Sequence, residues 1–280
     1  MSSSEHRGVP EMSYPAKAAC SVGEMPGRRC RRGAGPPPRR RASIWVKVMN
    51  VAITGSGGFI GSHLSKRLEM FGHRVTPLRR YLFAQEGVDC LAQALAGCHA
   101  VINLAGAPID RRWTDAVNRL HEPPGVMISA SAVGYYGSSG GCHGELDAPE
   151  ADSFLAELCV AWEKEAGLVN SSVRLVLTRF GVVLSPDGGA LGGALPEMMR
   201  PARFGVTATA GNPDHLFSWV ALEDLADALV FIMGRQYISG PVNVTAPERT
   251  TNREFYRAAA EHFHTRLSIR VPDAVPFRGC

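Results

Sequence analysis

The sequence predicts an α/β fold in which helices alternate with the strands of a parallel sheet. From residue 49 onward, short apolar segments suited to strands buried on both faces alternate with segments that carry apolar residues at helical spacing. Parallel strands need crossover connections, which are usually helical, so this alternation predicts a parallel sheet. A glycine-rich segment, "VAITGSGGFIGSHL" at residues 51–64, joins the first predicted strand to the first predicted helix.

The predicted elements follow one another in strand–helix order. Leu64 and Leu68 lie on one stripe of the first helix. Thr251 and Glu254 have the spacing of a capping box at the start of the last helix, with Thr250 as an alternative N-cap. Strands are predicted at residues 48–54, 73–78, 99–106, 125–137, 173–184 and 240–246. Helices are predicted at residues 58–70, 90–96, 153–169, 221–233 and 251–263.

The positive charge of the chain is concentrated at its start. Residues 1–48 hold ten Lys or Arg and three Asp or Glu, which gives a net charge of +7. Residues 49–280 hold twenty Lys or Arg and twenty-three Asp or Glu, which gives −3 and a total of +4. A body that is not basic argues against a general nucleic-acid binder. The longest apolar run, "LADALVFIM", is too short to cross a bilayer and contains Asp227. We therefore expect neither a nucleic-acid nor a membrane partner.

Residues 1–48 are expected to form a disordered basic leader, because their apolar residues are too sparse to offset the entropy of ordering. The alternatives are an organelle transit peptide, a basic tail that touches nucleic acid, and an extension before a body that begins near Met49. Seven cysteines without a C-x-x-C pair indicate reduced thiols, and we expect a cytoplasmic location. No metal site is predicted, because zinc needs three or four converging ligands.

The glycine-rich segment has the spacing T-G-x-x-G-x-x-G. In such a loop the first glycine makes a tight turn, the second lets the backbone approach a pyrophosphate, and the third lets the helix pack on the sheet. The phosphates then lie at the helix N-terminus, where free N–H groups favour anions. An ordinary glycine-rich turn is the alternative. The predicted cofactor-binding residues of this loop are Thr54, Gly55, Gly57, Gly58, Phe59, Ile60 and Gly61.

The end of the second predicted strand indicates which dinucleotide is bound. An acidic residue there would hydrogen-bond the adenosine ribose. This chain instead has Arg79 and Arg80, and a guanidinium suits a 2′-phosphate. NADP is therefore the predicted cofactor, with NAD as the second possibility. A pair of solvated surface arginines is the alternative interpretation.

Further motifs follow in a fixed order: "NLAG" at 103–106, "ISASAVGYYG" at 128–137, "FLAELCVAWEKEA" at 154–166, "RFGVVLSPDGGAL" at 179–191 and "FSWVALEDLADAL" at 217–229. With the glycine loop, they make residues 49–273 resemble the extended or atypical short-chain dehydrogenases/reductases, in particular NAD(P)-binding epimerase-like members. The resemblance implies a Rossmann-type doubly wound parallel sheet with a small C-terminal substrate lobe at about residues 185–273. Residues 274–280 would be a truncated tail.

The resemblance also implies roles for single residues. Asn103, Leu104, Ala105 and Gly106 match the loop that passes over the adenosine side of the cofactor. Ser131 matches the catalytic serine that hydrogen-bonds a substrate carbonyl or hydroxyl. A serine that only caps the backbone is the alternative.

The usual acid/base pair of these enzymes is missing. They use a Tyr as general acid/base and a Lys four residues later, whose positive charge lowers the Tyr pKa. No tyrosine in this chain is followed by a lysine at that spacing. Phe154 or Leu155 stands at the Tyr position, and Leu158 or Cys159 at the Lys position. Standard hydride-transfer chemistry is therefore in doubt.

Other residues are candidates to complete the site. Tyr135 or Tyr136, near Ser131, is a candidate acid, with aromatic packing beside a glycine turn as the alternative. Arg179, in the strand predicted at 173–184, is a candidate contact for substrate or cofactor. The segment "DGGALGG" at 187–193 resembles the loop that closes on substrate in extended relatives, or else is a linker.

Two parts of the chain are shorter than the resemblance implies. Only residues 107–127 connect "NLAG" to "ISAS", with room for about two turns of helix. The sheet face beneath this connection is expected to be under-packed. The chain also stops at "RVPDAVPFRGC", where relatives continue with a helical segment. Exposed apolar surface would follow, with marginal stability or association into homo-oligomers.

The sequence leaves three hypotheses. The first is an NADP-binding, epimerase-like reductase that acts on an unknown small carbonyl or sugar-type molecule. The second is a catalytically silent nucleotide-binding regulatory or scaffold protein. The third is a truncated product without activity.

Overall fold

The structure, a computed structural model, describes residues 48–83, 88–105, 112–137, 141–151, 153–186, 193–265 and 267–271. The chain divides into two units, residues 1–47 and 48–280, and every described residue belongs to the second. The predicted leader, apart from Val48, and the predicted tail therefore lie outside the described residues. No helix in the described ranges is both long and apolar enough to cross a membrane.

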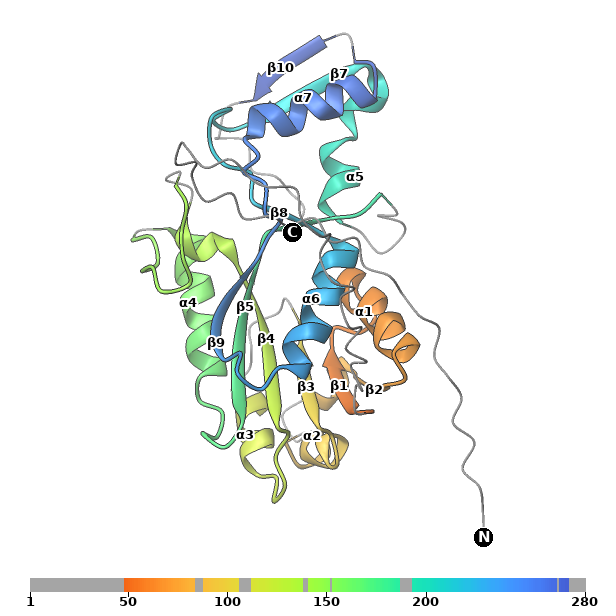
Figure 1. The fold of residues 1–280 in the computed structure, drawn as a ribbon, viewed down its shortest axis with the longest axis vertical. Helices are drawn as coiled ribbons and strands as arrows, with labels where there is room; N and C mark the ends of the chain where they lie inside the picture. The colour runs from red at the N-terminus through yellow and green to blue at the C-terminus, as the bar shows by residue number, and fades with distance from the viewer. Residues whose placement is uncertain are drawn as a thin grey trace, which may run out of the picture. The chain divides into compact units, whose positions relative to one another are not determined.

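Six parallel strands form the central sheet, in the order β2-β1-β3-β4-β5-β9 (Figure 1). Their bounds are β1 Asn50–Thr54, β2 Arg74–Leu78, β3 Ala100–Asn103, β4 Val126–Ala132, β5 Arg174–Phe180 and β9 Gly240–Val244. The order confirms the predicted doubly wound parallel sheet. Strand order reverses at β1, which has β2 on one side and β3 on the other, and ligands of such sheets bind outside the strand ends at this switch point.

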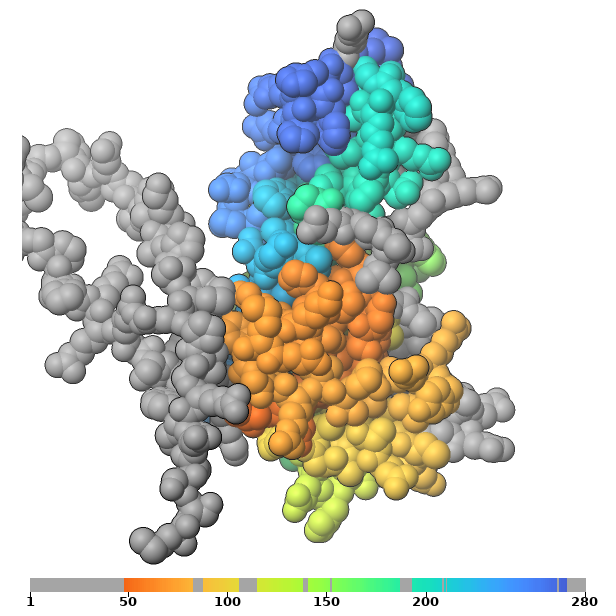
Figure 2. All heavy atoms as spheres, turned by 90° about the vertical axis from the view of Figure 1, so that its right-hand side faces the viewer, coloured from red at the N-terminus to blue at the C-terminus, as the bar shows by residue number. Residues whose placement is uncertain are grey.

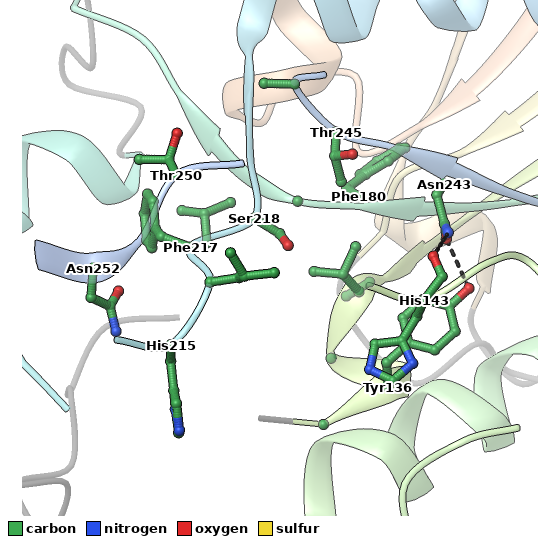
Figure 3. Close-up of a pocket in the computed structure, with 18 of the residues that line it drawn as sticks. Tyr136, His143, Phe180, His215, Phe217, Ser218, Asn243, Thr245, Thr250 and Asn252 are labelled. Carbon is green, nitrogen blue, oxygen red and sulfur yellow. Dashed lines mark hydrogen bonds between the residues drawn. The ribbon is translucent and has the colours of Figure 1, made fainter. Parts of the chain in front are cut away.

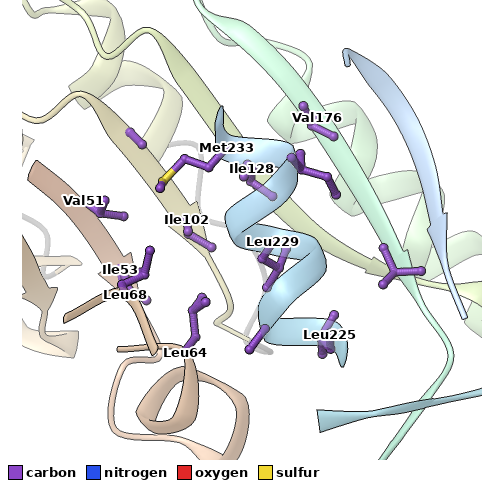
Figure 4. Packing of buried hydrophobic residues seen from close by; sticks show 14 of the residues in the cluster. Val51, Ile53, Leu64, Leu68, Ile102, Ile128, Val176, Leu225, Leu229 and Met233 are labelled. Carbon is purple, nitrogen blue, oxygen red and sulfur yellow. The ribbon is translucent and has the colours of Figure 1, made fainter. Parts of the chain in front are cut away.

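Helices cover both faces of the sheet. The helices α1 (Phe59–Met70) and α6 (Leu222–Gly234) bury their apolar stripes in one hydrophobic cluster, which Figure 4 shows packed against strand residues such as Ile102 and Ile128. On the opposite face lie α2 (Val88–Leu95), α3 (Arg112–Asn118) and α4 (Phe154–Ala166). Neighbouring strand residues alternate between the two clusters, as Val51 and Ala52 do in β1, because side chains point to opposite faces in turn.

The short crossover at 107–127 contributes to the second cluster. Its seven-residue helix α3 buries Ala116 and Val117 completely, against the same cluster as Leu91 and Leu95 of α2. At these positions the sheet face that was expected to be under-packed is covered.

Two predicted strands end earlier than the sequence pattern indicates. The first stops at Ala132 and passes into a 3-10 helix, η2 (Val133–Tyr136). The second breaks at Gly181, where the chain leaves β5 and Val182 donates a hydrogen bond to the carbonyl of Ser218. A Cβ on Gly181 would lie 3.0 Å from the carbonyl oxygen of Ser218, so glycine permits this close crossing. Apolar runs predicted both strands correctly but could not show where they bend.

The remaining described elements form a smaller lobe. A strand pair links β6 (Val182–Leu184) to β8 (Trp219–Ala221), and a second pair links β7 (Val206–Ala210) to β10 (Leu267–Val271). Three helices accompany them, α5 (Ala194–Met198), η3 (Pro201–Phe204) and α7 (Asn252–His262), and Figure 2 shows these teal and blue segments gathered at one end. The predicted capping box is present at α7, where Thr251 and Glu254 each accept a hydrogen bond from the other's backbone N–H.

Candidate functional site

The glycine-rich loop leads from β1 directly into α1. The N-cap residue is Gly58, which offers no side chain to the first turn, and that turn contains no acidic residue. The loop is closed by a hydrogen bond of 2.9 Å from the Gly58 N–H to the Gly55 carbonyl. The helix N-terminus therefore keeps its partial positive charge for an external anion.

The glycines are required by close contacts between backbone segments. Gly55 has a φ of +66°, and a Cβ on it would lie 2.9 Å from the carbonyl oxygen of Leu104. A Cβ on Gly61 would lie 2.1 Å from the carbonyl oxygen of Gly55. Gly57 differs, because a Cβ there would meet nothing within 4 Å. The loop is thus packed against the protein at two glycines and open at a third, which fits a cradle for a pyrophosphate.

A chain of polar contacts joins the ends of β1, β3 and β4. The Thr54 hydroxyl donates to Asn103 Oδ1 at 2.6 Å, and Asn103 Nδ2 donates to Ser129 Oγ at 3.3 Å. Backbone N–H groups of Leu104 and Ala105 complete the arrangement by donating to Thr54 Oγ1 and Asn103 Oδ1. Thr54 and Asn103 are each 1% exposed, so they hold the two loops together from beneath.

The other predicted cofactor residues lie around this loop. Phe59 starts α1, and its ring lies close to Gly193 at the start of α5. Ile60 packs against the first hydrophobic cluster. Gly106 and residues 187–192 of the predicted substrate loop lie outside the described residues.

Arg79 and Arg80 follow β2, the neighbour of β1 in the sheet. Arg79 comes directly after the strand, and Arg80 begins a short 3-10 helix, η1 (Arg80–Phe83). Both side chains are exposed, and neither makes a hydrogen bond or ion pair with another described residue. Both guanidiniums are available to an anion at this edge of the sheet.

Four predicted site residues meet in a buried network around Arg179. Arg179 donates from Nε and Nη2 to the two carboxylate oxygens of Glu163, each at 2.8 Å, and from Nη1 to the Tyr136 hydroxyl at 2.6 Å. Ser131 donates to the same carboxylate at 2.8 Å. The ring of Tyr135 lies under the guanidinium, 3.5 Å from ring centroid to Cζ. Arg179 contacts both tyrosines directly, and a fifth residue, Glu163, connects it to Ser131.

The ion pair is almost completely buried, with side-chain exposures of 3% for Arg179 and 10% for Glu163. Burial by itself would lower the pKa of Arg179, but hydrogen bonds to Glu163 and Tyr136 raise that pKa above its usual value. The guanidinium is consequently a permanent positive charge behind Tyr136.

Tyr136 connects this network to the surface of a cavity. Its hydroxyl donates to Asn243 Oδ1 at 2.9 Å, while Asn243 Nδ2 donates to the carbonyl of His143 (Figure 3). The His143 ring stacks on Tyr136, with centroids 5.0 Å apart. Asn243 thereby fixes the phenol and the segment around His143 together.

The cavity has a volume of about 1000 Å³ and lies between the carboxyl ends of β4, β5 and β9 and the small lobe. Because all six strands are parallel, the cavity and the glycine loop share one edge of the sheet. Tyr136 lines the cavity, whereas Ser131, Tyr135 and Arg179 do not. Arg179 therefore reaches the cavity through its hydrogen bond to Tyr136, and Ser131 through Glu163 and Arg179.

The positions expected for a Tyr/Lys pair also reach this cavity. Leu155, Leu158 and Cys159 line it, while Phe154 is 75% exposed and lies outside its lining. Burial raises the pKa of the Cys159 thiol. These side chains form an apolar wall that offers no phenol or amine for proton exchange. In the described part of the chain, no group of three His, Cys, Asp or Glu residues could hold a metal ion.

Sequence reasoning missed Glu163 and Asn243. Glu163 could have been found from helical periodicity, because it shares the inward face of α4 with Ala156, Cys159 and Ala166. An acidic residue on a buried helix face needs a cationic partner. Asn243 offered no such signal, since it lies in an apolar strand without a local motif.

Comparison with known proteins agrees with this geometry. Residues 51–139 match the NAD dependent epimerase/dehydratase family. The chain is 37% identical over 250 residues to an epimerase family protein of Mycobacterium bovis, Mb2239. This alignment covers 79% of this chain and 81% of the relative. The chain belongs to this family.

Two further relatives refine the comparison. The human epimerase family protein SDR39U1 is 31% identical, over 81% of this chain and 85% of that protein. Its crystal structure with NADPH aligns with a TM-score of 0.69 over 80% of this chain and 83% of that one, at 29% identity. A structure of MoeE5 with UDP-glucose and NAD shares the fold, with a TM-score of 0.64 and 20% identity. The alignment covers 80% of this chain and 85% of that one.

Proposed function

We propose that the chain binds NADP(H) and carries out hydride transfer with a small carbonyl or sugar-type substrate in the cavity. The proposal rests on one arrangement, an uncapped N-terminus of α1 together with two arginines at the end of β2 that pair with no other described residue. The pyrophosphate would lie at Gly57 and Gly58, and the 2′-phosphate at Arg79 and Arg80. The NADPH complex of the human family member supports this choice of cofactor.

The bound cofactor would supply or accept a hydride at the substrate carbon. The chain must then exchange a proton at the substrate oxygen, and Tyr136 is the candidate because its side chain lies on the cavity wall. Arg179 donates a hydrogen bond to the phenol oxygen and would stabilise negative charge that develops there. Glu163 orients Arg179 and Ser131.

A catalytically silent nucleotide-binding protein is the second candidate. It is favoured by Leu155 and Cys159, which place apolar surface where related enzymes present their Tyr and Lys. Such a protein would retain the glycine loop and bind the cofactor without turnover.

Cofactor titration followed by a substrate screen separates these functions. The purified chain is titrated with NADPH and with NADH while cofactor fluorescence is recorded, and we expect tighter binding of NADPH. A panel of carbonyl compounds is then screened for NADPH oxidation, with Tyr136→Phe as the variant that should lose turnover while keeping cofactor binding. Binding without any turnover favours the silent protein. No binding at about 1 mM cofactor, the upper end of ordinary KM values, would contradict both functions.

A further inference from the structure

The chemistry of the cavity lining indicates the class of substrate, an inference that rests on the proposed function. We propose that the cavity takes an uncharged carbonyl compound with an apolar body, and that it does not take a nucleoside diphosphate sugar. The fold neighbour MoeE5 binds UDP-glucose, so the distinction separates this chain from proteins that share its fold.

The first argument is the charge of the lining. A nucleoside diphosphate needs Arg or Lys side chains, or a free helix N-terminus, around its two phosphates. Among the described residues that line the cavity, Glu197 and Glu248 are acidic, and Arg249 is the single Arg or Lys. With histidines neutral, the described lining carries a formal charge of −1. A diphosphate would therefore find one guanidinium, Arg249, for its two phosphates.

The second argument is that three cations close to the lining already have ion-pair partners. Arg179 is held by Glu163 behind the wall and does not reach the cavity. Arg253 forms an ion pair of 2.7 Å with Asp214, and Arg200 forms one of 3.7 Å with Glu197. Moving any of these guanidiniums to a phosphate would break its ion pair.

The third argument concerns helix α7, which begins at the cavity with Asn252. Its N-terminus is not free, because Glu254 accepts the Thr251 N–H at 2.8 Å and Thr251 Oγ1 accepts the Glu254 N–H. These hydrogen bonds lower the pKa of Glu254, so its carboxylate keeps its negative charge. An anion at this helix end would face that carboxylate.

The rest of the lining suits an uncharged ligand. One wall is apolar and includes Leu155, Leu158 and Phe180. The lining also includes Ser218 and His215, labelled in Figure 3, whose side chains make no hydrogen bond to another described residue. These neutral groups could each accept or donate one hydrogen bond to a carbonyl or hydroxyl. An apolar body with a few neutral polar groups fits this division.

The test compares two probes of the same shape and different charge. The NADPH-loaded full chain is titrated with para-acetylbenzamide, which is neutral, with para-acetylbenzoate, which is an anion, and with UDP-glucose. Binding is followed by ligand-observed NMR, and turnover by NADPH absorbance. We expect the amide to bind at least about tenfold more tightly than the carboxylate, because the lining holds two carboxylates and one guanidinium. UDP-glucose should not bind at about 1 mM.

A charge-reversal variant checks that the lining causes this preference. In Glu197→Lys/Glu248→Lys the carboxylate probe should gain at least about tenfold in affinity. The matched control Glu69→Lys/Glu122→Lys changes the net charge equally at exposed residues outside the lining, and should alter affinity by less than about twofold.

Each outcome bears on the proposal. Tighter binding of UDP-glucose or of the carboxylate than of the amide would overturn it. Binding of none of the three probes would also overturn it, while the proposed function would stand as long as NADPH binds. If NADPH itself fails to bind, the proposed function falls, and the same probe order measured on the free chain still decides the charge preference of the cavity.

Discussion

Replacing Gly61 with alanine should disrupt the glycine loop and abolish most cofactor affinity. The new Cβ would lie 2.1 Å from the Gly55 carbonyl oxygen and 2.7 Å from Ser56 Cα, and both are backbone atoms that no rotamer change can move away. Reaching even a 3.0 Å separation requires helix and loop to move apart by 0.9 Å.

The size of the effect follows from that displacement. Forcing extra atoms into packed structure costs about 1–3 kcal/mol of folding stability. If the shift also removes one charge-assisted hydrogen bond from loop to phosphate, about 1.5–3 kcal/mol of binding is lost, which corresponds to an affinity about 10- to 150-fold weaker.

Gly57→Ala provides the contrasting variant. Its Cβ would meet nothing within 4 Å, so folding should be unaffected, while the methyl group enters the open side of the cradle and should weaken NADPH binding about tenfold. Gly234→Ala, also in open space but at the end of α6, is the control for both measurements. Stability is read from urea denaturation and affinity from NADPH fluorescence. If Gly61→Ala binds NADPH within about twofold of the native chain, the structural role given to Gly61 is wrong.

Three other predictions follow from the described contacts. Glu163→Gln should cost about 3–5 kcal/mol of stability in urea denaturation, because it leaves the buried Arg179 charge unpaired; an unchanged midpoint would contradict the burial of the pair. Arg80→Asp should shift the ratio of NADPH to NADH affinity toward NADH by about tenfold or more, measured by fluorescence titration; an unchanged ratio would place the 2′-phosphate elsewhere. Burial lowers the pKa of His73, so the folded state binds a proton less readily than the unfolded state. Protonation therefore favours unfolding, and folding stability is lost as the pH falls below the unfolded-state pKa of about 6.5. The urea midpoint should accordingly decrease as the pH is lowered from 7 to 5. His73→Gln should remove this part of the decrease, and the exposed control His121→Gln should retain it.

Local patterns predicted most of the fold because parallel strands and amphipathic helices carry their signals within single segments. The glycine loop and the capping box of Thr251 and Glu254 depend on short spacings, and both lie where the sequence indicates. The break at Gly181 was not predictable, since it depends on the approach of Ser218, 37 residues later in the chain.

The site was predicted less completely, for a related reason. Ser131, Tyr136 and Arg179 were each identified, but the partners Glu163 and Asn243 are brought to them by the packing of α4 on β4 and β5 and by the pairing of β9 with β5. That packing brings Glu163 between Ser131 and Arg179 and turns both side chains away from the cavity. A motif can name such residues, yet the direction of their side chains depends on tertiary contacts.

The unequal packing of the loop glycines has a consequence for how this family can change over time. Gly55 and Gly61 are held by contacts within the protein, so a descendant that stopped using a dinucleotide would still need both to fold. A Cβ on Gly57 would meet no described atom within 4 Å, so this position would be free to drift once no ligand approached it. Among descendants, loss of Gly57 alone would therefore report abandonment of the cofactor, while survival of its two neighbours would report only an intact fold.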